Sequence, residues 1–278
     1  TPEPTPKEGE FIGFSQVDAN TTYAIPAITT SATAILNNGV TVEVQKFQGD
    51  LDASVSVEYD ADSDITNVGI KDKEYPIFSF SKIDNSSVLY VFGSNAQNDE
   101  LIFDKASKST NEYQTYGTWN TVVTGAEVET VTVGAFSAGQ RTAIDAIPGS
   151  GRYKFGGSLV GYFSRLAVPL WVEAELSLDV DFQEKTVELN STSSYIYEID
   201  GAGIGFDPEL NLKGTLTYTD SNYFSGAVSS NLFSGTADGY FYGPNANEAG
   251  GTIFAPGRFE VNNMDAFFAS FGAKIVNP

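Results

Sequence analysis

The sequence predicts an all-β protein built from two domains. It is rich in aromatic residues, with 20 Phe and 14 Tyr against a single Met, and aromatic side chains favour the half-buried surface of a strand. Many short segments alternate apolar and polar residues with period two, which is typical of strands with one buried face. At 278 residues the chain is long enough for two β domains with separate cores.

Residues 1–9 are predicted to form a flexible tether. Proline alternates with polar residues from Thr1 to Pro6, a pattern that favours an extended chain with little packing. The first residue is not Met and no signal peptide is present, so we expect a mature or trimmed form.

Residues 10–150 are predicted to form a strand-rich domain. Asn37-Asn38-Gly39 separates two apolar runs, and Asn-Gly is a typical hairpin turn. A second hairpin is expected around the acidic segment Asp60–Asp64, between strands at 53–59 and 65–70. Further strands are expected at 77–80, 88–92, 101–103, 113–119 and 130–136. Proline and two glycines in Ile147–Gly151 mark the domain boundary.

Residues 151–278 are predicted to form an antiparallel barrel. Every even-numbered residue from Val172 to Phe182 is apolar, and the chain then turns at 183–185 and returns at 186–189. The alternation recurs at 210–218, with Gly214 at an inward position. Closely spaced strands with glycine at bends favour a closed barrel, because closure removes exposed edges. An open sandwich is the alternative.

The segment from Gly235 to Phe254 is predicted as a strand, one helical turn and a second strand. Pro244 suits the start of a helical turn, and Gly250-Gly251 is expected to let the backbone reverse into the next strand. In this interpretation Glu248 is structural, its carboxylate accepting backbone N–H groups near the helix N-terminus. Ligand binding is the alternative for Glu248. The aromatic run 240–242 is assigned to barrel packing.

Composition excludes several classes of function. The net charge is −21, both halves are acidic, and such a field repels phosphate backbones, so nucleic-acid binding is not expected. The absence of Cys excludes disulfides and thiolate chemistry, and the absence of His excludes Ser-His-Asp triads and His-ligated zinc or haem. No apolar run is long enough to predict a membrane-spanning helix.

Several segments of the C-terminal half, in their order and spacing, resemble the barrel domain of the transferrin-binding protein B family of surface lipoproteins. This family includes factor H-binding protein and hemophilin-like proteins. The segments are Tyr153–Gly157, Leu178–Phe182 with Lys185–Val187, Tyr223–Ala227, the Gly235–Phe254 segment and Phe268–Lys274. Tyr116–Trp119 followed by Ile147-Pro148 and Gly151 resembles the passage from the family's handle domain into its barrel.

The resemblance implies a fold and a function. The fold is an N-terminal strand-rich handle domain, residues 10–150, followed by a barrel of about eight strands, residues 151–278. The function is that of a non-enzymatic, surface-exposed outer-membrane lipoprotein, lipid-anchored or secreted, that binds a host protein or haem-bearing ligand. Such binding would serve iron acquisition with a TonB-dependent outer-membrane receptor. The lipidated N-terminal cysteine of the family is absent from this sequence.

Candidate sites have competing structural interpretations. Exposed aromatic residues of the handle would be anchors for a protein partner, with core packing as the alternative; they are Tyr90, Tyr113, Tyr116 and Trp119. Asp60–Asp64 alternates carboxylates as a calcium loop does, but the sixth position is Ile65 and the twelfth is Lys71, so a solvated turn and no metal site are predicted. The pairs Asp179/Asp181 and Glu173/Glu175 are placed on an outward strand face, against a glycosidase.

No cofactor is predicted, although haem stays open as a ligand. Without His, and with Met264 as the single methionine, haem would need a tyrosine ligand or contact without axial ligation. Two functions of other classes compete with iron acquisition. One is a surface protein that binds a host regulator or serves adhesion or immune evasion, and the other is an enzyme acting on surface polysaccharide.

Overall fold

The computed structural model describes residues 7–37, 40–59, 61, 65–71, 78–81, 89–94, 99–104, 111–124, 129–165, 168–198, 202–256 and 266–276. Most of the described residues lie in strands. Three 3-10 turns, η1 (Phe14–Gln16), η2 (Ile144–Ala146) and η3 (Pro208–Leu210), are the helical elements of the described part. The structure therefore confirms the predicted all-β class.

Sheet A contains the strands of the N-terminal half and forms a half-barrel. Its strand order is β5-β4-β3-β2-β9-β8-β7-β6, with β1 paired in parallel with β2. The bounds are β1 (Lys7–Gly9), β2 (Thr21–Asn37), β3 (Val40–Tyr59), β4 (Ile65–Lys71), β5 (Phe78–Ser81), β6 (Leu89–Ser94), β7 (Asp99–Asp104), β8 (Gln114–Thr124) and β9 (Glu129–Gly139).

The two predicted hairpins of this half are confirmed. Strands β2 and β3 pair antiparallel around residues 38–39, and β3 and β4 pair around Asp60–Asp64. The acidic residues of the latter segment lie outside the described residues. Strand β1 falls inside the segment predicted as a tether, because its backbone pairs with Thr21 to Tyr23 of β2.

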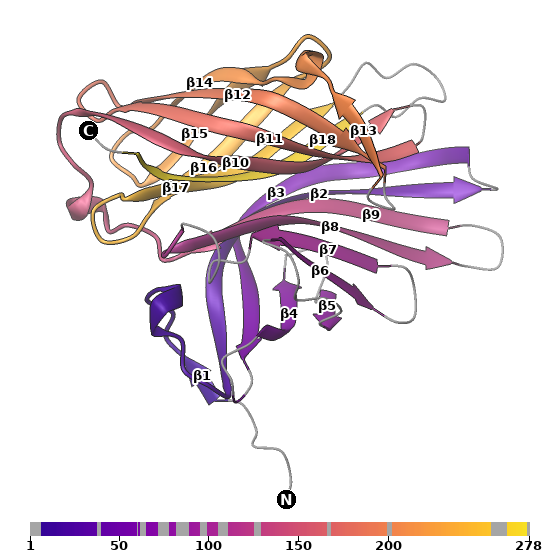
Figure 1. Cartoon of the computed structure of the whole chain (residues 1–278), viewed down its shortest axis with the longest axis horizontal. Helices are drawn as coiled ribbons and strands as arrows, with labels where there is room; N and C mark the ends of the chain where they lie inside the picture. Colours follow the sequence, from indigo (N-terminus) through magenta and orange to yellow (C-terminus); the bar gives the residue numbers. More distant parts are fainter. Residues whose placement is uncertain are drawn as a thin grey trace, which may run out of the picture.

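The long hairpin of β2 and β3 connects two regions of sheet A. It runs beside the barrel and then curves away toward β1 and β4 (Figure 1). The β2–β3 register shifts at three places, between Ala27 and Thr29, between Ser31 and Thr33 and between Ile35 and Leu36. Such irregularities bend a strand and increase its twist, which explains how one hairpin serves both regions.

Sheet B is the closed barrel. Its order is β11-β10-β18-β17-β16-β15-β14-β12, and a further pairing of β11 with β12 closes the ring, while β13 pairs with β12 beyond the end of β14. The bounds are β10 (Arg152–Arg165), β11 (Val168–Asp181), β12 (Thr186–Tyr197), β13 (Gly203–Phe206), β14 (Lys213–Thr217), β15 (Tyr223–Ser229), β16 (Ser234–Tyr242), β17 (Glu248–Pro256) and β18 (Ala266–Ile275). The barrel prediction is confirmed over the sandwich.

The barrel core follows from the period-two pattern. All even-numbered residues from Val172 to Phe182 are buried in it, as their alternation predicts. Phe182, Phe224 and Tyr218 pack around Phe241, the central ring of the aromatic run at 240–242. Interior aromatic rings of this size fill a small barrel, so the core is a packed scaffold.

The Gly235–Phe254 segment differs from its prediction in two respects. Residues 243–246 form a turn that contains no helical residues, and Glu248 is the first residue of β17. Gly250 and Gly251 lie inside β17 and do not reverse the chain. A Cβ at Gly250 would lie 1.9 Å from Gln114 Oε1, so the absence of a side chain there serves the close approach of sheet A.

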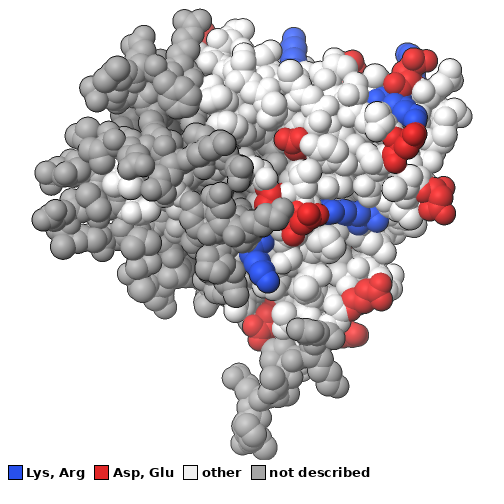
Figure 2. Space-filling model, turned by 180° about the vertical axis from the view of Figure 1, so that it is seen from behind, with Lys and Arg blue, Asp and Glu red and all other residues white. Residues whose placement is uncertain are grey.

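The charges of the described residues are scattered on the face of the molecule that Figure 2 shows. It is the face opposite to that of Figure 1. No helix among the described residues is long and apolar enough to cross a membrane.

Candidate functional site

Sheet A packs on the barrel through β8 and β9, which lie across β17 and β18 (Figure 1). Two glycines that are paired across β17 and β18, Gly250 and Gly272, provide the flat surface for this contact. Gln114 of β8 lies over them, and its Nε2 donates to the carbonyls of Ala249 and Ala273 at 3.0 and 3.1 Å. One buried amide thus joins both barrel strands to sheet A.

Glu248, two residues before Gly250 in β17, makes a second contact between the barrel and the N-terminal half. Its side chain is 3% exposed, and its carboxylate accepts the backbone N–H groups of Glu112 at 2.5 Å and Tyr113 at 3.0 Å. Burial raises the pKa of the Glu248 carboxyl to about 7, and the charge of Glu112 acts in the same direction against these N–H donors. The side chain does accept backbone N–H groups, but they belong to the two residues that precede β8 and not to a helix of the barrel.

Two of the four predicted aromatic anchors, Tyr113 and Tyr116, lie where sheet A contacts the barrel. Trp119 is fully buried in the core of sheet A, and Tyr116 is 3% exposed with its hydroxyl 2.5 Å from Ser158 Oγ on the barrel. Tyr113 is half-buried and packs against Tyr240 and Tyr242 of the barrel. Tyr90 lies in β6, and its side chain is outside the described residues. The packing alternative therefore describes Tyr116 and Trp119.

A cleft of about 490 Å³ opens on the barrel beside Tyr116 of sheet A. One row of paired residues crosses four barrel strands in this cleft: Val160 of β10, Glu173 of β11, Tyr195 of β12 and Phe206 of β13. Ser158, Glu175, Ser193 and Tyr197 complete the polar and aromatic lining. We refer to this site as the aromatic cleft.

A β-bulge shapes the wall of the aromatic cleft. Between the paired positions 173/195 and 175/192, β11 has one residue and β12 has two, Ser193 and Ser194. Ser193 takes φ +56°, a left-handed conformation that suits the extra residue. The Asn211 side chain accepts from both the N–H and the hydroxyl of Ser194, which fixes the bulge. Bulges re-aim side chains, and this one sets the direction of Tyr195 and Tyr197.

The aromatic side chains form a continuous surface. Trp171 contacts Tyr197 with ring centroids 4.7 Å apart, Tyr197 contacts Tyr195 at 4.7 Å, and Tyr195 meets the edge of Phe206 at 4.8 Å. Phe206 is 71% exposed, a large value for a phenylalanine side chain. Exposed aromatic rings in a concave site are a feature of binding surfaces.

Two carboxylates lie beside these rings. Glu173 accepts a hydrogen bond from the Tyr197 hydroxyl at 3.3 Å, and burial raises the pKa of its carboxyl above the ordinary value. Glu175 accepts from the Ser193 hydroxyl at 3.3 Å. Among the described residues that line the cleft there is no Lys or Arg, so no described basic side chain of the lining faces either carboxylate.

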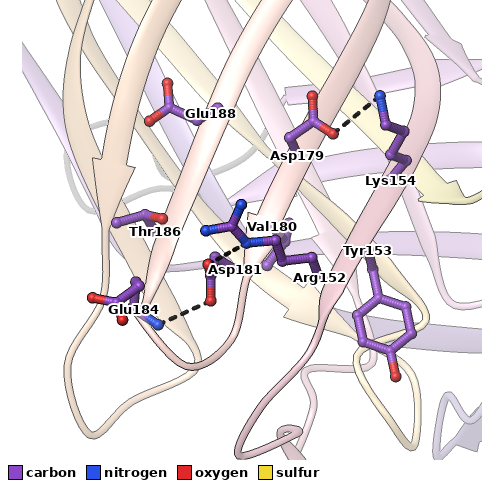
Figure 3. A pocket seen from close by; sticks show the side chains of 9 residues that line it. All are labelled: Arg152, Tyr153, Lys154, Asp179, Val180, Asp181, Glu184, Thr186 and Glu188. Atoms are coloured by element: carbon purple, nitrogen blue, oxygen red, sulfur yellow. Dashed lines mark hydrogen bonds and ion pairs between the residues drawn. The ribbon is translucent and has the colours of Figure 1, made fainter. Parts of the chain in front are cut away.

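A second, charged groove on the same barrel serves as a contrast. Figure 3 shows Arg152 and Lys154 of β10 beside Asp181 and Asp179 of β11, paired at 2.6 and 3.5 Å. Both aspartates lie on the outward face, as predicted. Their charges are already neutralised locally, and exposed ion pairs of this kind contribute little. The other predicted pair, Glu173 and Glu175, lines the aromatic cleft instead.

The sequence interpretation did not identify Trp171, Tyr195, Tyr197 and Phe206 as site residues. A local signal exists for two of them, because Tyr195-Ile196-Tyr197 alternates around Ile196, which faces the core. Residues on either side of an inward residue point outward. Trp171 and Phe206 come from other strands, and their approach depends on the pairing of β11, β12 and β13.

Residues 147–275 match the family model for the C-lobe and N-lobe β-barrels of transferrin-binding protein B. A mutant of transferrin-binding protein B from Haemophilus parasuis Hp5 is 17% identical over 90% of this chain, with a TM-score of 0.50 and 46% of its own length covered. The isotype 1 protein from serogroup B Neisseria meningitidis is 16% identical over 82% of this chain, with a TM-score of 0.44 and 53% of its length covered. The chain thus spans about half the length of these proteins. No curated protein sequence matches it.

Proposed function

Because residues 147–275 form a barrel of the transferrin-binding protein B family, we propose that this chain is a non-enzymatic bacterial surface protein that captures a host protein. The observation that carries the proposal is the match of the barrel to a family of binding proteins. The aromatic cleft supports it, because the cleft combines an exposed Phe206 with polar groups on a rigid scaffold.

We further propose a role in iron acquisition. The matched protein is named for binding transferrin, which is an iron carrier. A captured carrier would be passed to a TonB-dependent outer-membrane receptor. A lipid anchor in front of residue 1 would hold the protein at the outer membrane. Strand β1 lies at the end of sheet A that is remote from the barrel (Figure 1), so such an anchor would leave the barrel and its aromatic cleft accessible.

The partner is tested by binding of the whole chain to defined ligands. The immobilised protein is exposed to human and animal transferrin in iron-loaded and iron-free forms, to haemoglobin, and to serum and haemolysate. We expect saturable binding of one iron-carrying protein. Capture of a serum protein without iron would support the host-regulator alternative instead, and absence of any binding above background would contradict the proposed function.

Haem is tested separately. A visible absorption spectrum of the purified protein is recorded with and without added haem. A shifted Soret band would make haem the ligand, bound either through a tyrosine or without axial ligation, since the chain has no His. An unchanged spectrum is expected if the ligand is an intact protein.

A further inference from the structure

The aromatic cleft presents negative charge next to aromatic faces. Glu173 lies opposite Tyr195 in the β11–β12 pairing, and Phe206 lies opposite Tyr195 on the other side. A carboxylate and two rings therefore occupy one row of neighbouring positions. The partly buried Glu173 carboxylate accepts its side-chain hydrogen bond from Tyr197, a neutral donor that leaves the charge uncompensated.

The described residues of the cleft include no basic group that would neutralise these carboxylates. Its described lining includes Glu173 and Glu175 but no basic residue, and no ion pair joins either carboxylate to another described residue. In the charged groove of Figure 3, by contrast, each aspartate is paired with Arg152 or Lys154. The two sites share β11, so the difference is a property of the cleft and not of the strand.

We infer that the aromatic cleft binds a guanidinium side chain from a basic, arginine-bearing segment of the partner protein. A guanidinium group stacks on aromatic faces and donates a fork of N–H groups to a carboxylate. Tyr195, Tyr197 and Phe206 provide the faces, and Glu173 and Glu175 provide the acceptors. A lysine ammonium would gain the charge interaction but not the planar stacking.

Charge complementarity supports an arginine over a neutral ligand. A neutral sugar could also stack on Tyr195 and Phe206, but it would leave the desolvated charge of Glu173 uncompensated. The net charge of −21 favours approach of a basic segment from a distance. The inference rests on the proposed function, because it assigns the partner's contact chemistry.

The test uses the whole chain and a pair of synthetic peptides, Gly-Arg-Gly-Arg-Gly and the same peptide with citrulline in place of arginine. Citrulline keeps the shape of the side chain and removes its charge. Binding is measured by calorimetry at low and high salt. We expect the arginine peptide to bind at least about tenfold more tightly than the citrulline peptide, with a loss of affinity in salt.

Matched variants locate the peptide. Glu173→Gln and Phe206→Ser are each expected to weaken binding of the arginine peptide about tenfold. Phe206 is largely exposed, so its replacement leaves the fold intact, and thermal unfolding checks both variants. Glu188→Gln, an exposed glutamate on the neighbouring strand outside the cleft, is the control and should bind as the unmodified protein does.

The inference would be overturned if both peptides bound with equal affinity, or if Glu173→Gln bound the arginine peptide as tightly as the unmodified chain does. It would also be overturned if the chain bound a neutral oligosaccharide and Phe206→Ser abolished that binding. Host-protein capture is measured with the same variants. If both variants still capture the host protein, the proposed function is supported and this inference is contradicted. If the cleft binds arginine specifically but no host protein is captured, this inference is supported and the proposed function is contradicted.

Discussion

Replacing Gly272 with valine is expected to lower the free energy of unfolding by roughly 3 kcal/mol, because it places a branched side chain where sheet A meets the barrel. A Cβ at this position would lie 2.3 Å from two atoms of the Tyr116 ring. Tyr116 has little room to move, since it is 3% exposed and its hydroxyl is bonded to Ser158. Denaturant unfolding followed by far-UV circular dichroism measures the loss.

Two further variants separate the clash from a general effect of losing a glycine. A Cβ at Gly149 would have no neighbouring atom within 4 Å, and this glycine lies at the surface, so Gly149→Ala should change stability little. In a double-mutant cycle, Tyr116→Ala removes the ring that the new valine side chain would strike. The double variant should therefore be more stable than the sum of the two single losses predicts. Additive losses would refute the clash.

Strand β11 shows which parts of this fold the sequence predicts well. Its alternation from Val172 to Phe182 is local, and a closed barrel buries one face of each strand, so the pattern alone assigns every side chain to the core or the surface. The hairpin of β11 and β12 follows in the same way, because the turn at 183–185 is short and polar. Such features depend only on residues that are close in the chain.

The glycine pair at 250 and 251 shows what the sequence leaves open. Consecutive glycines are compatible with a turn, and also with a strand that another backbone or side chain approaches closely. The structure has the second arrangement, and the approaching group is Gln114, which lies 136 residues earlier in the chain than Gly250. A contact of that sequence separation leaves no local pattern in either segment.

The aromatic cleft likewise depends on contacts between different strands, which no local pattern predicts. Trp171, Tyr195 and Phe206 belong to three strands, and each one alone resembles a residue of a half-buried strand face. They form a continuous surface because a bulge shifts the β11–β12 register and because β13 pairs with β12 beyond β14. The alternation predicts which residues face outward, but only the strand pairing shows which outward residues are neighbours.

Glu248 is expected to make the protein less stable as the pH rises from about 4.5 to about 7. The pKa of its carboxyl is raised from 4.5 to about 7 by burial in the folded protein, so within this window the unfolded chain ionises and the folded protein does not. Ionisation of the unfolded chain favours unfolding, and the accumulated loss is about 3 kcal/mol. Below the window both states are protonated, and above it both are ionised, so this contribution to stability becomes constant on either side.

The Glu248→Gln variant isolates this effect. Glutamine has one acceptor oxygen where the carboxylate has two, and it cannot accept from both Glu112 and Tyr113 in the same way, so the variant carries a constant loss of stability. It cannot ionise, and its unfolding free energy should therefore lack the fall between pH 4.5 and 7. The difference between the unfolding free energies of the two proteins, measured by urea unfolding across pH 4 to 8, should change by about 3 kcal/mol.

The exposed Glu188→Gln variant is the control for the loss of one carboxylate. If the difference between unmodified protein and Glu248→Gln stays constant across this range, Glu248 is ionised in the folded state throughout, and its two N–H donors, Glu112 and Tyr113, outweigh the cost of burying its charge.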